Sequence, residues 1–311
     1  MANRPFRFGV QARGIHARRE WTELARRVEA LGYSSLTLPD HFDAQLAPVP
    51  ALMAAAAVTD RLRVGSLVWD NDYKHPLVLA KELATMDVLS DGRLEIGIGA
   101  GWMISDYEQA GMTYDSAGVR IDRFVEGLAV IKGLMAEGPF TFAGEHYVIT
   151  GHDGTPKPVQ SPRPPILIGG GGKRVLSIAA READIVGINA TMSAGVVGRD
   201  AFDTMTAGAV DGKVKIVRDA AGDRWDDIEM NIRAFLVNIT SDTNAAAEGI
   251  GRMIGVSAAE VLETPFALVG PPDKLVDDLL ARRERWGFSY VIVGGDDVES
   301  FAPVVEALAG R

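Results

Sequence analysis

An aspartate and a histidine stand side by side directly after a predicted buried strand. The strand covers residues 35–38, and Asp40 and His41 follow it after a single proline. A histidine titrates near neutral pH and serves as a general acid or base, and a neighbouring carboxylate can bond a ring or a hydroxyl group. We therefore take His41 as a candidate catalytic residue and Asp40 as a candidate ligand contact. A capped strand end is the alternative interpretation of the pair.

Four consecutive glycines lead from a second predicted strand into a basic helix start. The turn follows residues 165–168 and consists of Gly169, Gly170, Gly171 and Gly172, followed by Lys173. Glycine lets the backbone approach a ligand, and the free N–H groups of a helix N-terminus favour an anion. The spacing is not that of a P-loop, because Leu167 stands where its first glycine belongs. We interpret the turn as a phosphate cradle, with a tight strand-to-helix turn as the alternative.

A third predicted strand, residues 94–99, also ends in glycines. Gly99 and Gly101 are followed by Trp102, which stands where a dinucleotide-binding fingerprint would require another glycine. We expect the glycines to let a flat ring lie against the strand end, with Trp102 as a wall. Small residues needed for packing inside a barrel are the alternative.

Several other chemistries are excluded by what the chain lacks. It has no cysteine, so disulfides, thiolate nucleophiles and iron–sulfur clusters are absent, and redox chemistry would require a bound organic cofactor. His16, His146 and His152 are scattered without metal-ligand spacing, and Asp70 and Asp72 lack the register of a calcium loop. There is no Gly-x-Ser-x-Gly elbow. We therefore predict no metal site and no serine hydrolase.

The elements that must position these residues alternate regularly between strand and helix. Strand patterns recur eight times, each followed by a helical pattern, and several of them are continuous apolar runs typical of buried parallel strands. This count favours a single (β/α)8 TIM barrel, an α/β fold over residues 1–311, and an open doubly wound sheet is the alternative. The predicted strands are residues 6–10, 35–38, 62–68, 94–99, 165–168, 184–188, 230–237 and 290–293.

Three long connections interrupt this alternation, at residues 100–118, 138–164 and 190–207. The first and third follow strands, so we expect them at the functional C-terminal face of the barrel. The second precedes a strand and is expected on the opposite side. Its residues 140–148 form two short β-like runs around a glycine, which predicts a hairpin.

Composition and charge limit the classes of partner that the protein is expected to bind. The chain has 311 residues, 47% of them hydrophobic, and carries 32 Lys and Arg against 42 Asp and Glu, for a net charge of −10. This charge opposes binding to nucleic acid or to anionic membranes. No apolar run of about 18 residues is present. We expect a cytoplasmic protein, with a transit-like segment at residues 1–19 as the alternative.

Taken together, four motifs resemble the bacterial luciferase-like superfamily of flavin and deazaflavin oxidoreductases, and in particular its branch dependent on coenzyme F420. The likeness covers nearly the whole chain, although each motif alone is weak. The motifs are Leu38-Pro39-Asp40-His41-Phe42, residues 75–82 leading to 87–93, Gly97-Ile98-Gly99-Ala100-Gly101-Trp102, and residues 164–172.

The resemblance implies a TIM barrel with the tricyclic ring of the cofactor at its C-terminal mouth. In deazaflavin members a non-proline cis peptide in a bulge of strand three backs the ring, and the matching position here is Ser66-Leu67. The aspartate at the position of Asp40 contacts the ring, and the histidine at the position of His41 donates or accepts a proton in relatives that oxidise sugar phosphates. The implied cofactor contacts are Asp40, Ser66, Leu67, Trp69, Gly99, Gly101, Trp102, Gly169, Gly170, Gly171, Gly172 and Lys173.

One departure from these relatives bears on the substrate. They carry a carboxylate where this chain has Trp102, which weakens the case for a sugar phosphate. Our main hypothesis is therefore an F420-dependent oxidoreductase that moves a hydride between C5 of the deazaflavin and a small organic substrate. One alternative is an FMN-dependent monooxygenase that uses oxygen and flavin reduced by a separate reductase. Another is a protein that binds the deazaflavin without turnover. A homodimer is expected by analogy with the family.

Overall fold

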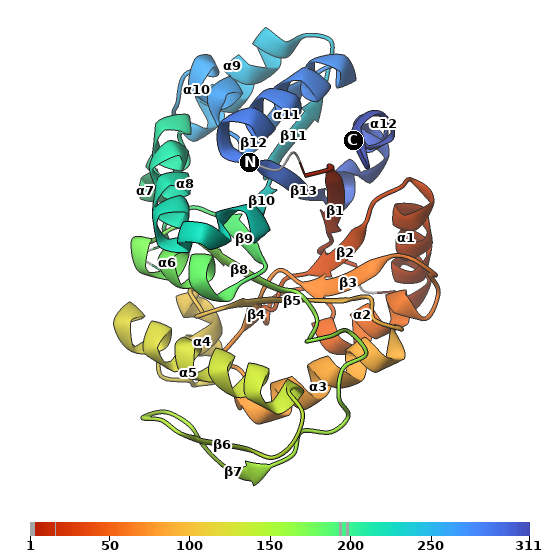
Figure 1. The fold of residues 1–311 in the computed structure, drawn as a ribbon. Coiled ribbons are helices and arrows are strands. Elements are labelled where there is room, and N and C mark those ends of the chain that lie inside the picture. Colours follow the sequence, from red (N-terminus) through yellow and green to blue (C-terminus); the bar gives the residue numbers. More distant parts are fainter. Residues whose placement is uncertain (1–3, 16, 193–194, 197–198) are drawn as a thin grey trace.

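The computed structural model describes residues 4–15, 17–192, 195–196 and 199–311, and it places eight parallel strands in a closed barrel (Figure 1). Each strand pairs with its two neighbours, and the pairing of β3 with β5 closes the ring. This confirms the predicted barrel and rules out the open sheet. The barrel strands are β1 (Arg7–Gln11), β2 (Ser35–Leu38), β3 (Arg63–Ser66), β5 (Leu94–Gly99), β8 (Ile166–Gly170), β9 (Ile185–Ile188), β10 (Glu229–Arg233) and β13 (Phe288–Gly294).

A helix follows each barrel strand and covers the outside of the sheet (Figure 1). Alternate residues of each strand pack either under these helices or into the barrel interior, as the two-residue period of a strand requires. Leu167, Ile185, Tyr290 and Ile292 form the inner cluster. The covering helices are α1 (Arg18–Ala30), α2 (Pro48–Ala56), α3 (Pro76–Leu89), α5 (Ala117–Met135), α6 (Lys173–Glu182), α8 (Ala207–Ala221), α11 (Pro272–Trp286) and α12 (Val298–Leu308).

Strand three continues beyond an irregular step. After β3, the two-residue strand β4 (Trp69–Asp70) pairs with the end of β5. A non-proline cis peptide lies in this step, but it joins Leu67 to Val68, one residue later than the position matched by the resemblance. The Leu67 N–H, just before this bond, donates to the Leu38 carbonyl at 2.9 Å and continues the pairing with β2.

The three insertions lie where the chain order predicts. The second contains the antiparallel hairpin of β6 (Phe140–Ala143) and β7 (Val148–His152), which confirms the predicted hairpin. The first insertion contains the short helix α4 (Ile104–Ala110), which was not predicted. The third includes α7 (Arg199–Asp203), and its residues 193–194 and 197–198 lie outside the described part of the chain, as does His16.

The predicted strand over residues 230–237 is wrong in its second half. The Ala234 N–H still donates to Ile292 of β13, but the Phe235 N–H donates to Phe266, so the chain changes its pairing partner between these two residues. Beyond that point β11 (Leu236–Ile239) pairs in parallel with β12 (Ala267–Gly270) outside the barrel. The connecting helices α9 (Thr243–Ile254) and α10 (Ala258–Glu263) share a small core of their own with β12.

Two short 3-10 turns, η1 (Gly222–Asp227) and η2 (Gly295–Asp297), complete the elements. Within the described ranges, no helix combines the length and the apolar character needed to cross a membrane.

Candidate functional site

The predicted site residues meet at one end of the barrel. Asp40, Gly101 and Gly170 lie at or just beyond the C-terminal ends of β2, β5 and β8. Because all barrel strands are parallel, these ends share one mouth. The expectation that the three motifs converge is therefore confirmed.

His41 is held at this mouth by a carboxylate from the first insertion. Its Nδ1 lies 2.7 Å from Oδ2 of Asp106, and the side chains are only 11% and 3% exposed. The Tyr73 hydroxyl donates to the same Asp106 oxygen at 2.8 Å. With Nδ1 engaged, Nε2 is the ring nitrogen left for a ligand, since it has no partner among the described residues. A carboxylate bonded to one imidazole nitrogen orients the ring and sets its tautomer.

Trp102 forms a wall next to the histidine. The two rings meet edge to face, with centroids 5.8 Å apart. The backbone of Trp102 is fixed because its carbonyl accepts a hydrogen bond of 2.9 Å from the Tyr114 hydroxyl. The carboxylate that contacts His41 therefore does not come from position 102. It belongs to Asp106, four residues further along the chain.

Two further carboxyls lie close to this pair. Asp40 accepts a hydrogen bond of 3.3 Å from the backbone N–H of Asp70. Burial raises the pKa of Asp40, and burial together with the charges of Asp72 and Asp40 raises the pKa of Asp70 to about 7. The Tyr107 hydroxyl lies 3.4 Å from both carboxyl oxygens of Asp70. The mouth therefore holds a carboxyl that changes its charge near neutral pH.

The glycines after β5 are explained by their protein neighbours. Gly101 has a φ of +75°, and an added Cβ would lie 2.0 Å from the Tyr107 hydroxyl and 2.6 Å from Asp70 Oδ2. A Cβ at Gly99 would lie 3.0 Å from the Val68 side chain. The absence of side chains here makes room for β4 and for the carboxyl cluster, which supports the packing alternative for these two positions.

The four-glycine turn presents an open helix N-terminus. Gly172 is the N-cap of α6, and an added Cβ there would meet nothing within 4 Å. In contrast, a Cβ at Gly171 would lie 2.3 Å from the Ala190 carbonyl oxygen. Lys173 is exposed, whereas Arg174 is turned away and pairs with Asp122 of α5. The first turn of a helix has N–H groups without intrahelical partners, so this end can hold an anion.

The floor of the mouth is apolar. Leu67 and Val68 are partly exposed and pack on the inner cluster of the barrel, while Ser66 is buried and its hydroxyl donates to the Leu38 carbonyl. Trp69 instead packs under the helices, with 1% of its side chain exposed, so we remove it from the residues that line the mouth. A flat apolar floor beside an open helix N-terminus fits a tricyclic ring with a phosphate-bearing tail.

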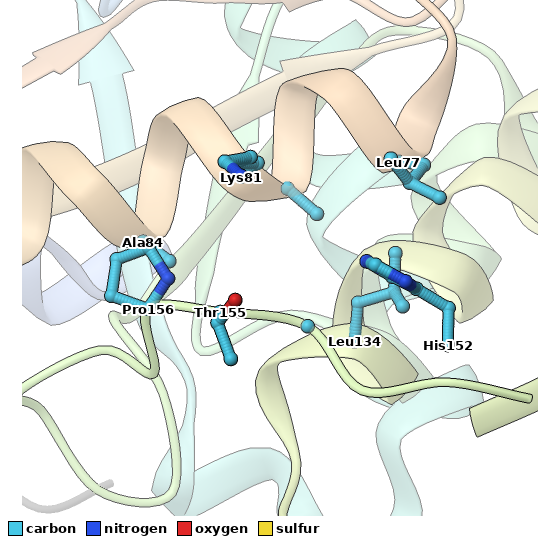
Figure 2. Close-up of a pocket in the computed structure, with 9 residues that line it drawn as sticks. Leu77, Lys81, Ala84, Leu134, His152, Thr155 and Pro156 are labelled. Atoms are coloured by element: carbon cyan, nitrogen blue, oxygen red, sulfur yellow. The ribbon is translucent and has the colours of Figure 1, made fainter. Parts of the chain in front are cut away.

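A small pocket lies elsewhere, on the outside of the barrel (Figure 2). Lys81 and neighbouring residues of α3 line one side, and the other side is lined by Leu134, His152, Gly154, Thr155 and Pro156. None of the candidate site residues contributes to it. No group of three or more His, Asp or Glu side chains in the described ranges could hold a metal ion.

Several mouth residues were not anticipated from the sequence. Asp106 lies in α4 and Tyr73 in the loop after β4, and only the fold brings them to His41. Gln11 at the end of β1 donates to the Leu67 carbonyl at 2.7 Å, and Arg233 at the end of β10 donates to Gln11 at 3.1 Å. Gln11 directly follows the predicted strand over residues 6–10, which was the signal that could have identified it, whereas Arg233 fell inside the strand predicted over residues 230–237.

Comparisons with known proteins agree with this geometry. The family model described as luciferase-like monooxygenase matches residues 4–290. Among curated relatives, an FMNH2-dependent dimethylsulfone monooxygenase of Pseudomonas fluorescens is 25% identical over 78% of the chain. An F420-dependent glucose-6-phosphate dehydrogenase of Amycolatopsis mediterranei is 29% identical over 53%. The alignments span 64% and 52% of these relatives, so the chain matches between half and two thirds of their length.

The fold agrees as well. The structure of the coenzyme F420-dependent tetrahydromethanopterin reductase from Methanopyrus kandleri superposes with a TM-score of 0.78 at 19% identity, and 98% of each chain is covered. At this identity the similarity concerns the barrel alone.

Proposed function

Because this chain belongs to the luciferase-like monooxygenase family, we propose that it is a coenzyme F420-dependent oxidoreductase that transfers a hydride between the deazaflavin and a small organic substrate. At the coarser level, the chain is a flavin- or deazaflavin-dependent oxidoreductase, since relatives of both kinds match it. The choice of the deazaflavin, the substrate and the roles of individual residues are the proposal.

The contact between His41 and Asp106 at the mouth is the observation that carries this proposal. When a hydride leaves or joins a carbon that bears oxygen, that oxygen must lose or gain a proton. A histidine oriented through Nδ1 has Nε2 available for this proton. A pair of this kind beside an apolar floor suits hydride transfer to or from an alcohol or carbonyl group.

Each group of the mouth then has one task. The bound deazaflavin supplies hydride chemistry at its C5 carbon. His41 accepts the hydroxyl proton at Nε2 when the substrate is oxidised and returns it when the substrate is reduced. Asp106 orients the imidazole and stabilises its charged form, and Trp102 narrows the space beside it. The Gly172 end of α6 binds the phosphate of the cofactor, and Leu67 and Val68 support its ring.

Cofactor titrations test the choice between the two cofactors. Absorbance and fluorescence are followed while F420 or FMN, each in its oxidised and reduced form, is added under anaerobic conditions. We expect tight stoichiometric binding of F420 and weak binding of FMN. Tight binding of reduced FMN, with oxygen consumption and no hydride transfer to F420, would instead support the monooxygenase. Stoichiometric F420 binding without turnover in a screen of alcohols and carbonyl compounds would support the cofactor carrier.

His41→Ala tests the catalytic role. We expect turnover to fall by roughly 10²–10⁴-fold, the usual range for loss of a general acid or base, while F420 affinity stays within a few-fold. His152→Ala is the matched control, because His152 lies in the outer pocket away from the mouth. Loss of affinity with normal turnover per bound cofactor would make His41 a cofactor ligand only.

A further inference from the structure

A charged side chain at the mouth has no ion-pair partner among the described residues. Arg233 is the last residue of β10 and is partly buried. Its guanidinium donates from Nε to Gln11 at 3.1 Å and from Nη1 to the carbonyl of Ala234, and Nη2 has no hydrogen bond to the described part of the chain. It takes part in no ion pair within the described ranges. Burial lowers the pKa of Arg233 to about 10, so the group still carries its charge at neutral pH.

One carboxylate and one cation lie near Arg233 without pairing with it. The carboxyl of Asp297 attracts Arg233 without reaching ion-pair distance and accepts a hydrogen bond of 3.2 Å from the Gly294 N–H. Arg13, in the loop after β1, is exposed, and its positive charge acts on Arg233 more weakly than the charge of Asp297 does. The exposed ring of Phe235 lies 5.2 Å from the guanidinium. Together these groups leave a net single positive charge.

These cations lie in the half of the mouth that faces the proposed cofactor residues. The cofactor contacts follow β2, β3, β5 and β8, which are consecutive around the barrel. Arg13 and Arg233 follow β1 and β10, which flank β13 on the other side of the ring, and β9 separates Arg233 from the glycine turn. An anion held by Arg233 would therefore lie opposite the cofactor, where a substrate must lie.

A buried charge without a partner costs free energy, and this cost is offset when an oppositely charged group binds. A guanidinium matches the two oxygens of a carboxylate in a planar, paired geometry. A carboxylate carries one negative charge, whereas a phosphate group carries nearly two at neutral pH. The single net charge of this corner thus suits a carboxylate.

We propose that Arg233, assisted by Arg13, binds a carboxylate group of the substrate and thereby restricts this enzyme to small carboxylate-bearing compounds. The assignment of the ligand as substrate rests on the function proposed above. Gln11 links this corner to the floor, because it accepts from Arg233 and donates to the Leu67 carbonyl under the ring position. Arg233 is in this way a specificity-determining residue rather than a proton carrier.

Binding of simple anions to the protein without cofactor tests the proposal. Calorimetric titrations use acetate, succinate, benzoate and inorganic phosphate at constant ionic strength, with benzyl alcohol as the neutral probe. We expect at least one carboxylate to bind more tightly than phosphate and benzyl alcohol. Arg233→Met should lower its affinity at least tenfold, about 1.4 kcal/mol. Arg13→Gln, a change at an exposed position, should lower it several-fold.

Two controls separate this proposal from the proposed function. Arg181→Gln, an exposed change on α6, should leave carboxylate affinity unaltered. F420 affinity of Arg233→Met, measured in parallel, should stay within a few-fold of wild type. If Arg233→Met does not fold, Arg13→Gln and Arg233→Lys carry the test, and Arg233→Lys should lower the affinity several-fold, because lysine keeps the charge but not the paired geometry.

The outcomes are distinguishable. If F420 binds but no carboxylate does, the proposal is overturned and the proposed function stands. If Arg233→Met loses F420 affinity tenfold and no carboxylate binds to wild type, Arg233 is a cofactor ligand and the proposal is again overturned. If carboxylates bind through Arg233 but neither F420 nor FMN binds, the anion site stands and the proposed function fails.

Discussion

The imidazole of His41 contacts two side chains, and each of them constrains it in a different way. Asp106 occupies Nδ1 at 2.7 Å, and Trp102 packs against the ring edge. A carboxylate in this position stabilises the protonated imidazole and holds Nε2 in one direction. Asp106 is thus a positioning residue that acts through His41.

We predict that Asp106→Asn lowers turnover by about 10–100-fold, because the amide holds the imidazole less firmly and can bond to the wrong ring tautomer. The cofactor affinity should stay within a few-fold. Steady-state kinetics and cofactor titration measure the two effects, and Asp106→Glu should restore part of the rate. Unchanged turnover would contradict the positioning role of Asp106.

The buried carboxyl of Asp70 makes folding depend on pH. Its pKa is raised to about 7 in the folded protein from an ordinary value of 3.8, mainly by burial. Between these values the folded state binds more protons than the unfolded state, so stability falls as pH rises from about 4 to 7 and is level above that range. The expected loss is on the order of 2–4 kcal/mol.

Asp70→Asn should remove this loss, since the amide does not titrate but can still accept from the Asp72 N–H. Urea unfolding at pH 5 and pH 8 measures the difference, and we expect the variant to gain stability relative to wild type at pH 8. Asp219→Asn on the exposed face of α8 is the control. Equal pH dependence of Asp70→Asn and wild type would contradict the prediction.

At the residue scale, the sequence identifies groups that stand directly after strands but not those that fold toward them. Asp40 and His41 follow β2, and their place at the mouth is therefore predictable. Asp106 contacts His41 although the two residues are 65 positions apart in the chain. It lies in α4, a helix within a segment that the sequence predicted only as a long connection. Trp69 shows the reverse case, because β4 turns its side chain under the helices.

At the scale of elements, the four-glycine turn combines two physical demands. Gly171 must lack a side chain because the Ala190 backbone is close, whereas Gly172 has extended backbone, with φ of −86° and ψ of 148°, and open space around it. Gly172 can therefore be replaced without a steric conflict, as can Gly169, but only Gly172 caps α6. It gives a direct test of anion binding by α6.

We predict that Gly172→Glu lowers F420 affinity at least tenfold, about 1.4 kcal/mol or more, because its carboxylate would lie where the phosphate should bind. Stability should not fall, since a negative charge at a helix N-terminus is favourable. Gly172→Gln, similar in size but neutral, is the matched control and should retain more affinity. Titration of each variant with F420 measures its affinity, and urea unfolding measures its stability. Equal losses in the two variants would point to steric occlusion instead of charge.

Element boundaries are predictable where a pattern is local and fail where partners change. The eight barrel strands are short strand-like stretches followed by helical patterns, so each is recognisable in isolation. The end of β10 is different, because residues 230–237 form one strand-like stretch that the fold divides between β13 and Phe266. No local pattern encodes that exchange, since it depends on a segment about 30 residues away.

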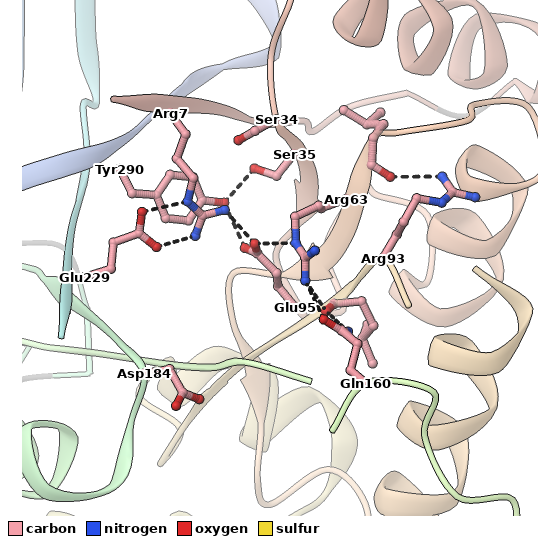
Figure 3. A network of polar contacts seen from close by, with 12 residues as sticks. Arg7, Ser34, Ser35, Arg63, Arg93, Glu95, Gln160, Asp184, Glu229 and Tyr290 are labelled. Atoms are coloured by element: carbon pink, nitrogen blue, oxygen red, sulfur yellow. Dashed lines mark hydrogen bonds and ion pairs between the residues drawn. The ribbon is translucent and has the colours of Figure 1, made fainter. Parts of the chain in front are cut away.

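At the scale of the whole molecule, the end of the barrel opposite the mouth is closed by charges (Figure 3). Arg7 lies between Glu95 and Glu229, at 2.5 and 2.6 Å, and Arg63 bonds to Glu95 at 2.7 Å. These four residues stand at the N-terminal ends of β1, β3, β5 and β10, so the network ties together strands that are not all neighbours. The guanidinium of Arg7 also lies 3.5 Å from the centre of the Tyr290 ring.

Glu95 is the centre of this network, which makes it the strongest test of how the barrel is held together. Burial pushes the pKa of Glu95 up, but Arg7 and Arg63 bring it below the ordinary carboxyl value of 4.5. The stability that Glu95 contributes is therefore present above about pH 4.5 and is lost as pH falls through its folded pKa. Removing its charge would leave two guanidinium groups close together without their shared counter-ion.

We predict that Glu95→Gln lowers the free energy of unfolding by about 3–5 kcal/mol at pH 7, the usual cost of breaking a buried ion pair from one side. The difference from wild type should shrink as the pH falls below about 4.5, because the unfolded chain then takes up a proton at Glu95 more readily than the folded protein does. Cofactor affinity and turnover per folded molecule should stay within about twofold, since the mouth lies at the other end of the strands. Urea unfolding at pH 3.5 and 7 measures the effect. Glu299→Gln, which breaks an exposed pair with Arg27, should lower the free energy of unfolding far less. A loss in Glu95→Gln no larger than in this control would mean that apolar packing alone holds the barrel closed at that end.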